Sequence, residues 1–195
     1  MRRKSFDALV SAAGLVVATV LLAASGLLFW ANSFIDDNVR TQLVAQKIFF
    51  PKAGSESLND PAVKPYLSKY AGQQLSNGEQ AKAYADHFIA VHLNGIGGGK
   101  TYSELSAQAQ ANPTDTALQG KVATVFRGET LRGLLLNAYA FGKMAEVALV
   151  AAWIALGTGL ALLVLGVLGL MHARRTSYDV KVHVPGWHPE QMPAT

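Results

Sequence analysis

The residues from Asn94 to Thr101 end in Gly-Lys-Thr, as a phosphate-binding P-loop does. A P-loop holds phosphate with the backbone amides of a glycine-rich turn that follows a strand and opens a helix. In this chain Asn94 stands where the loop needs a glycine, and the residues before it repeat apolar side chains with a helical period. We therefore expect residues 94–99 to link two helices, with Thr101 capping the second, and we expect no bound nucleotide.

Two histidines and a carboxylate lie close together in the chain, at His87, His92 and Asp86. These are the residue types of a two-histidine, one-carboxylate iron site. Five residues of helix turn the chain by about 500°, so imidazoles that are five residues apart point about 140° away from each other. The spacing therefore predicts no metal site. It predicts a buried His92 on an apolar stripe and a solvated His87.

Nucleophilic catalysis has no candidate residues in this sequence. The chain contains no cysteine and no Gly-x-Ser-x-Gly turn. The carboxylates Asp36, Asp37, Glu129 and Glu146 lie near apolar runs rather than in a cluster, and Lys143 has the three-residue spacing of a surface ion pair with Glu146. We therefore predict that the protein is not an enzyme and has no cofactor.

Two uncharged apolar runs, at 8–35 and 147–171, are the elements that position these residues. A bilayer core about 30 Å thick is crossed by on the order of 20 apolar residues in helix, so both runs are long enough. Because a backbone in lipid must satisfy its own hydrogen bonds, a single apolar segment crosses as a helix. We predict an all-α membrane protein in which two transmembrane helices are joined by an extracytoplasmic all-helical domain at 36–146.

The charges of the two short tails predict the orientation. The formal net charge of the chain is +4, and most of the excess lies next to the apolar runs. The residues are Arg2, Arg3 and Lys4 before the first run, and Arg174 and Arg175 after the second. Because Lys and Arg near a span stay on the cytoplasmic side, we predict a two-pass plasma-membrane protein with cytoplasmic tails at 1–7 and 172–195. Its predicted partner is the lipid bilayer, and it binds no nucleic acid.

The first run also has features of a cleaved signal peptide, since a basic start precedes an alanine-rich apolar stretch. That stretch is about twice the usual length of roughly 7 to 15 residues. The aromatic pair Phe29-Trp30 near its end is typical of a membrane interface. We therefore predict that the first run stays in the mature protein as an anchor.

Small residues recur at spacings of four in both runs. Small side chains let helix backbones approach closely in lipid, where no hydrophobic force drives association. Two interpretations stay open, because the small faces could pair within one chain or could recruit a second copy or another membrane protein. The predicted helix-packing residues are Gly14, Ala18 and Gly26 in the first run and Ala151, Ala155 and Gly159 in the second.

Capping residues and helix breakers divide the segment between the runs. Pro51 ends the helix that leaves the first run, because proline disfavours helix in the preceding residue. Ser76 with Glu79, and Thr101 with Glu104, have the spacing of capping boxes. The predicted elements are a loop at 51–60 and helices at 61–69, 76–93, 101–111 and 115–126, with a last helix running from 129 into the second span.

One face of this last helix is predicted to pack against the helix that leaves the first run. Its residues are Leu131, Leu134, Leu135, Ala138, Phe141 and Ala145. The tail at 178–189 alternates briefly before its Pro and Gly, which is typical either of an extended docking peptide or of a disordered end.

Four segments and the basic, apolar N-terminus carry a family resemblance. The segments are KIFFPKAG at 47–54, KYAGQQLSNGEQAKAYADHFIAVHL at 69–93, GGKTYSELSAQAQ at 98–110 and FRGETLRGLLLNAYAFGKM at 126–144. In these segments the chain resembles a group of uncharacterised two-pass membrane proteins of actinobacteria. Some relatives carry the label of aromatic ring-opening dioxygenase, an activity that would need histidines and a carboxylate converging on iron. The resemblance implies the two-pass topology and no catalytic residues.

The sequence favours a non-enzymatic role as an accessory, scaffold or sensing module of the cell envelope. Two alternatives stay open. The first is an extracytoplasmic enzyme whose metal or acid/base site is assembled by the fold, and the second is a homo-oligomeric channel. The spans carry no ionisable residue, which disfavours transport because carriers place such residues at membrane depth.

Overall fold

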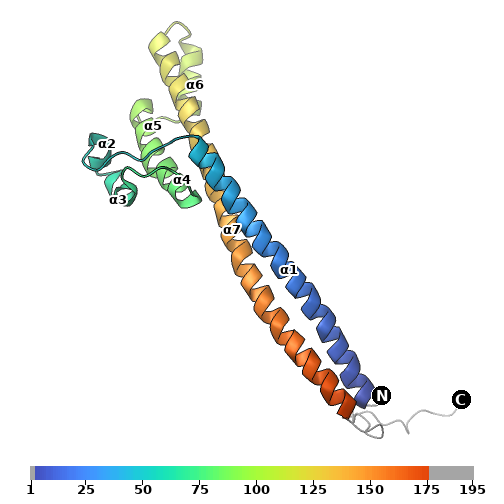
Figure 1. The fold of residues 1–195 in the computed structure, drawn as a ribbon. Coiled ribbons are helices and arrows are strands. Elements are labelled where there is room, and N and C mark those ends of the chain that lie inside the picture. Colours follow the sequence, from blue (N-terminus) through green and yellow to red (C-terminus); the bar gives the residue numbers. More distant parts are fainter. Residues whose placement is uncertain (1–2, 176–195) are drawn as a thin grey trace, which may run out of the picture. The chain divides into compact units, whose positions relative to one another are not determined.

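The computed structural model describes residues 3–175, and in that range the chain forms helices and no strand (Figure 1). The elements are α1 (Arg3–Ala45), α2 (Glu56–Asn59), α3 (Lys64–Leu67), η1 (Ser68–Tyr70), α4 (Gly78–Tyr84), η2 (Ala85–Ile89), α5 (Ala90–Gly97), α6 (Tyr102–Ala111) and α7 (Thr116–Arg175). The predicted all-α class is confirmed for these residues. The peptide predicted at 178–189 lies outside the described residues.

Helices α1 and α7 are each long and apolar enough to cross a membrane. Contacts divide the described chain into two compact units. The paired-helix unit contains α1 up to Phe29 and α7 from Val150 onward, and the helical unit contains Trp30–Leu149.

In the paired-helix unit, α1 and α7 pack antiparallel along a seam that repeats every seven residues. The buried residues with this spacing are Ser11, Ala18 and Ser25 on α1, and Ala152, Gly159, Gly166 and Ala173 on α7. A seven-residue repeat is the pattern of two helices that supercoil in a left-handed sense. The backbones lie close together, because a Cβ atom on Gly166 would lie 3.3 Å from the Ser11 carbonyl oxygen.

Two contacts at the Ser25 end hold the pair in register. The buried Ser25 hydroxyl donates a 3.0 Å hydrogen bond to the Ala152 carbonyl oxygen. The Phe29 and Trp153 rings meet edge to face, with their centroids 5.1 Å apart.

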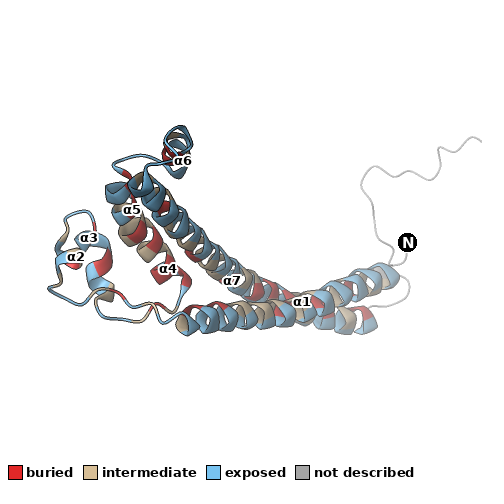
Figure 2. Ribbon diagram, turned by 90° about the horizontal axis from the view of Figure 1, so that it is seen from above, coloured by how far each residue is buried: buried red, intermediate tan, exposed pale blue. Residues whose placement is uncertain are grey.

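The helical unit has a hydrophobic core to which α1, α2, α3, α4, η2, α5 and α7 contribute buried residues; Figure 2 colours buried residues red. Val39 and Leu43 come from α1, and Leu135 comes from α7. The remaining buried residues are Phe50, Leu58, Val63, Leu67, Leu75, Ala81, Ala85, Ile89 and Leu93. The core therefore brings together the two long helices and the short elements between them.

The first helix ends at Ala45, five residues earlier than the predicted end before Pro51. Lys47 has a φ of 53°, in the left-handed region that a helix cannot contain. Residues 48–50 then run extended beside 73–75, where the Phe50 amide donates a 2.9 Å hydrogen bond to the Gln73 carbonyl oxygen. Backbone pairing with a segment far along the chain replaces the last predicted turn.

The segment from 51 to 70 contains two short helices and a 3₁₀ turn instead of the predicted loop and single helix. α2 lies inside the predicted loop, and α3 begins at Lys64, three residues after the predicted start. The Asp60 carboxylate accepts a 2.8 Å hydrogen bond from the Ala62 amide. Asp60 therefore closes a local turn before α3, not the first turn of a longer helix.

The cap of α4 is Asn77 and not the predicted Ser76. The Asn77 side chain accepts a 2.9 Å hydrogen bond from the Gln80 amide, and the Gln80 side chain accepts one of 2.8 Å from the Ser76 amide. After α4 the helix continues through the π-helical η2 and α5 to Gly97. Residues 94–97, predicted as loop, are thus helical, and Gly98 ends the helix with a left-handed φ of 60°.

The predicted capping box of α6 is confirmed. The Thr101 side chain accepts from the Glu104 amide, and the Glu104 carboxylate accepts from the Thr101 amide at 2.8 Å. α6 ends at Ala111, as predicted. The two helices predicted from 115 onward are one continuous helix, α7, at whose start the Asp115 carboxylate accepts a 2.9 Å hydrogen bond from the Leu118 amide.

Candidate functional site

The candidate site lies in the helical unit, where the first turn of α4 packs on α7. A Cβ atom on Gly78 would lie 3.1 Å from the Tyr139 Cα and 3.2 Å from the Ala138 carbonyl oxygen. At Gly142, one turn further along α7, a Cβ atom would lie 3.5 Å from the Gly78 Cα. The backbones touch here because glycine occupies the contact, and the charged side chains of both helices are brought within reach of one another.

Lys143 forms the first ion pair across this contact. Its ammonium binds the Glu79 carboxylate of α4 and lies 2.9 Å from the Glu146 carboxylate of α7. The hydrogen bonds to Glu146 and Glu79 raise the pKa of Lys143 well above its ordinary value. The same ammonium lies 5.6 Å from the centroid of the Tyr139 ring, within the range of a cation–π contact. A single lysine thus links α4 to α7.

Asp86 forms the second link to α7, from the η2 turn that follows α4. It binds the Lys82 ammonium, and its other oxygen lies 3.2 Å from the Arg132 guanidinium of α7. The hydrogen bond from Lys82 lowers the pKa of Asp86, and the Arg132 bond lowers it further, against an opposing effect of partial burial. Arg132 also lies 3.4 Å from Glu129, so its charge is shared by two carboxylates.

Asp86 should make the stability of the helical unit sensitive to acid. Because the pKa of Asp86 in the folded chain lies below the ordinary 3.8, its stabilising effect is present above that value and is lost as the pH falls through the lowered pKa. We expect the unit to lose stability as the pH falls through 3.8 and below, by more in the parent than in Asp86→Asn. Helix content measured against pH checks this, with Asp37→Asn as the control. An equal loss in parent and Asp86→Asn would contradict it.

A polar hollow of about 260 Å³ lies beside the Lys143 ion pair. Its lining includes the polar side chains of Asp36, Tyr70, Glu79, Tyr139, Lys143 and Glu146. At its edge, the Asn32 side chain donates a 2.9 Å hydrogen bond to the Ala145 carbonyl oxygen. Glu79 and Glu146 both bind Lys143, so the hollow is a set of internal ion pairs with aromatic walls.

A second, smaller hollow of about 180 Å³ shares Tyr70 and Glu79 with the first. In it the His87 imidazole stacks on the Tyr66 ring, with centroids 3.5 Å apart and planes within 3°. His87 lies in the π-helical turn Ala85–Ile89, a kind of turn that is frequent at functional sites. The sequence predicted a solvated His87, whereas the structure has its ring half-buried against α3.

The prediction of a buried His92 is wrong. His92 is exposed, its ring lies 4.3 Å from that of Phe88, and its Nδ1 lies 2.7 Å from the Phe88 carbonyl oxygen. The extra residue in the π turn rotates the following helix, so the buried stripe continues to Leu93 instead. Within residues 3–175, no group of three or more His, Asp or Glu side chains is placed to hold a metal ion.

Lys100 and Thr101 of the Gly-Lys-Thr segment form hydrogen bonds with other residues of the chain. The Lys100 ammonium donates a 2.9 Å hydrogen bond to the Gln108 side chain. At the start of α6 the Glu104 carboxylate accepts from both the amide and the hydroxyl of Thr101, and these bonds lower the pKa of Glu104. The Glu104 carboxylate therefore places a negative charge in the first turn of α6.

The six predicted helix-packing residues fall into three groups in the paired-helix unit. Ala18, Ala155 and Gly159 are buried, and a Cβ atom on Gly159 would lie 3.0 Å from the Leu22 side chain. Ala151 is half-buried. A Cβ atom on Gly14 or Gly26 would meet nothing within 4 Å, and Gly26 is exposed. The structure therefore brings the first three into the contact and leaves Gly14 and Gly26 outside it.

Reasoning from spacings of four missed much of this contact. Ser11, Ser25 and Gly166 lie in it, and none of them has another small residue four positions away in the chain. The signal that could have found them is the seven-residue repeat of small residues in each run.

Comparison of the chain with protein-family models, with curated proteins and with solved structures gives no match. The resemblance to actinobacterial two-pass membrane proteins stays a prediction.

Proposed function

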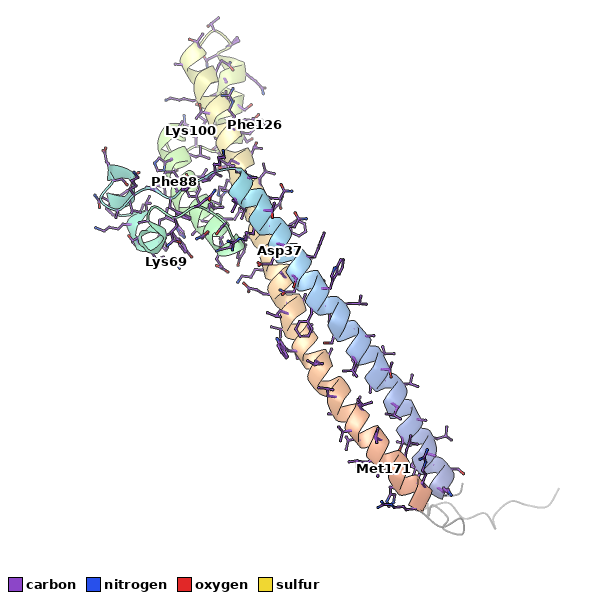
Figure 3. All side chains as sticks on the ribbon, viewed as in Figure 1. Asp37, Lys69, Phe88, Lys100, Phe126 and Met171 are labelled. Atoms are coloured by element: carbon purple, nitrogen blue, oxygen red, sulfur yellow. The ribbon has the colours of Figure 1, made fainter. Side chains whose placement is uncertain are left out.

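We propose that the protein is an integral membrane protein in which α1 and α7 cross the plasma membrane, and that its helical unit is a non-enzymatic scaffold or accessory module outside the cytoplasm. The observation that carries the proposal is the composition of the two surfaces in the paired-helix unit. The seam between α1 and α7 contains mostly small residues, while the large apolar side chains project outward (Figure 3).

These outward side chains need an apolar solvent. In the most apolar windows of α1 and α7, only 11% and 17% of the residues are buried, whereas a core helix of a soluble protein is mostly buried. Each large apolar side chain left in water forgoes about 1.5–3 kcal/mol of burial free energy. Residues more than half exposed include Leu9, Val16, Val20 and Leu27 on α1, and Val150, Ile154, Val164 and Leu165 on α7. A lipid bilayer covers such a surface on every side.

Contacts of α1 with α7 support an anchor that stays in the mature protein. Ser25 supplies the hydrogen bond to the Ala152 carbonyl, and Phe29 supplies the ring against Trp153. Cleavage after the first run would remove both partners and would expose the small-residue face of α7 to lipid.

The scaffold role is supported by how the charged groups of the helical unit are used. Lys143 and Arg132 on α7 bind Glu79 and Asp86 on α4 and η2, so these groups hold the elements together. Gly78 adds backbone contact at the same place. The result is a rigid helical surface, which suits a protein that positions a partner.

Two measurements test the membrane proposal. We expect the full-length protein to stay in the membrane pellet after washing at alkaline pH, and to keep its N-terminal residues by mass spectrometry of the purified chain. Reporter fusions should give a cytoplasmic fluorophore signal at the C-terminus and an extracytoplasmic reporter signal near Gly99. The reason is that Lys and Arg residues next to a span stay on the cytoplasmic side.

The contrary outcomes are distinct from one another. Release by the alkaline wash would contradict membrane insertion, and loss of about the first 30 residues would favour a signal peptide. Reversed reporter signals would contradict the orientation and leave the insertion intact. Reporters moved to Lys121 serve as a control for local folding, since this exposed residue lies on the same predicted side.

A further inference from the structure

A hollow of about 430 Å³ lies in the paired-helix unit, where the first turns of α1 lie beside the last turns of α7 (Figure 1). Its apolar walls are Phe6 and Val10 on α1 and Leu165 and Leu168 on α7, whose side chains are 45% to 64% exposed. Ser11 is buried and Gly169 half-buried, and a Cβ atom on Gly169 would overlap the Ser11 hydroxyl. These small residues therefore line the deepest part of the hollow, between two rows of large apolar side chains.

The polar lining of the hollow lies near the basic ends of the two helices. Asp7 on α1 and His172 on α7 both line it. Residues three apart share a face of a helix, so the face with Asp7 continues at Lys4 and the face with His172 continues at Arg175. Arg174 is two residues from His172, about 200° around α7. Among the described residues on these two faces, the Lys and Arg side chains outnumber the one carboxylate, so this end of the hollow has a net positive charge.

We propose that this hollow binds one anionic phospholipid of the phosphatidylglycerol type. The inference rests on the proposed membrane insertion, which surrounds the apolar walls with acyl chains and places the basic ends of α1 and α7 at the depth of the headgroups. Lys4 and Arg175 then attract the lipid phosphate, because basic side chains between membrane helices on the cytoplasmic side bind acidic headgroups. As a carboxylate, Asp7 accepts hydrogen bonds, and the hydroxyl groups of a glycerol headgroup donate them.

Charge favours an anionic lipid over the other occupants of a hollow in a membrane. Two copies of the chain, inserted in the same direction and joined here, would bring Lys4, Arg174 and Arg175 of both copies together at one depth, and like charges in an interface are destabilising. A phosphatidylcholine molecule would cover the apolar walls, but its headgroup has no net charge. Phosphatidylglycerol covers the walls with an acyl chain and also brings a negative charge to the basic end.

Native mass spectrometry of the full-length protein in mild detergent measures the headgroup preference. We expect added phosphatidylglycerol to bind about fivefold or more tightly than phosphatidylcholine with the same acyl chains. The reason is that each Lys or Arg near an acidic headgroup contributes about 1 kcal/mol, which is about fivefold in affinity. Equal binding of the two lipids overturns the proposal, and so does a dimer of the chain without bound lipid.

Two neighbouring arginines separate the hollow from a general basic surface. Arg175→Gln should lower the affinity for phosphatidylglycerol about fivefold and leave that for phosphatidylcholine unchanged. The matched control is Arg174→Gln, which removes the same charge from an equally exposed class of residue on another face of α7. The control should keep the preference of the parent. Equal losses in the two variants would mean that the lipid is attracted without entering the hollow, and would overturn the proposal.

Filling the hollow tests the position of the acyl chain. Val10→Trp should reduce the binding of both lipids, because the larger side chain occupies the space between the apolar walls. The matched control is Leu9→Trp, since Leu9 is 61% exposed and does not line the hollow. A Val10→Trp variant that keeps the helix content and the lipid affinity of the parent overturns the proposal. The arginine variants, which remove no apolar contact, decide the question if the tryptophan variant does not fold.

Parallel samples distinguish this failure from that of the proposed function. If the chain resists the alkaline wash but binds the two lipids equally, only the lipid site is wrong. If the wash releases the chain from the membrane, the membrane proposal fails and the lipid site fails with it.

Discussion

Replacing Leu135 by alanine is expected to lower the free energy of unfolding of the helical unit by about 2–5 kcal/mol. Leu135 lies on α7 with 0% of its surface exposed, inside the core that also contains Val39 and Leu43 of α1. Truncation removes the free energy of burying the side chain and leaves a cavity among elements that are fixed by their ion pairs. A loss of this size is a large part of the stability of a small domain.

The neighbouring residue provides a matched control for this substitution. Leu134 is next to Leu135 on the same helix but is 57% exposed, so Leu134→Ala should change stability by less than about 0.5 kcal/mol. Amide hydrogen exchange of the full chain in mild detergent measures the effect, since core amides of α7 and α5 open with the free energy of the whole unit. Equal changes in exchange for the two variants would contradict the assignment of Leu135 to the core.

This pair of leucines also shows where sequence reasoning about the fold succeeds and where it stops. Apolar residues at helical spacing correctly predict that α7 has a buried face, but they place Leu134 and Phe141 on it as well as Leu135. Leu134 and Phe141 are more than half exposed. Which side of α7 is buried depends on the positions of α1 and α4 together, and the local pattern of α7 contains no information on either neighbour.

Signals that act within one turn of helix are the ones that can be predicted reliably from sequence. The Thr101–Glu104 box and the end of α6 at Ala111 are where the spacing predicts them, because a cap needs only residues three apart. The end of α1 is different, since it depends on pairing of residues 48–50 with residues 73–75. The prediction from Pro51 used only the effect of proline on the preceding residue, so it could not include this pairing.

Most contacts of the candidate site, like the end of α1, depend on residues that are far apart in the chain. Lys143 with Glu146 is a local pair that its spacing predicts. The pairs of Lys143 with Glu79 and of Arg132 with Asp86 join residues far apart in the chain. They exist because Gly78 lets α4 touch α7, and nothing in the sequence around either charge indicates the other.

In the paired-helix unit, Gly166→Leu is expected to force α1 away from α7, at a cost of about 1–3 kcal/mol. A Cβ atom on Gly166 would lie 2.7 Å from the Leu15 Cγ and 3.3 Å from the Ser11 carbonyl oxygen. Leu15 could move only at the expense of the seam, and the Ser11 carbonyl belongs to the backbone. The small-residue pattern with a spacing of four does not include Gly166. In the seven-residue seam, however, Gly166 is one of the positions that leave least room for a larger side chain.

Gly157→Leu is the matched control, because a Cβ atom there would meet nothing within 4 Å on the same helix. Both substitutions replace glycine by leucine and gain the same helix propensity, about 0.8–1.0 kcal/mol, so the difference between them isolates the helix contact. Fluorescence of Trp153, which packs on Phe29 of α1, reports pairing during titration of the full chain with a denaturing detergent, once the other two tryptophans are changed to phenylalanine. We expect Gly166→Leu to separate the helices at a lower detergent fraction than the parent and Gly157→Leu to match or exceed the parent. If the two variants separate together, α1 and α7 do not pack through the seven-residue seam.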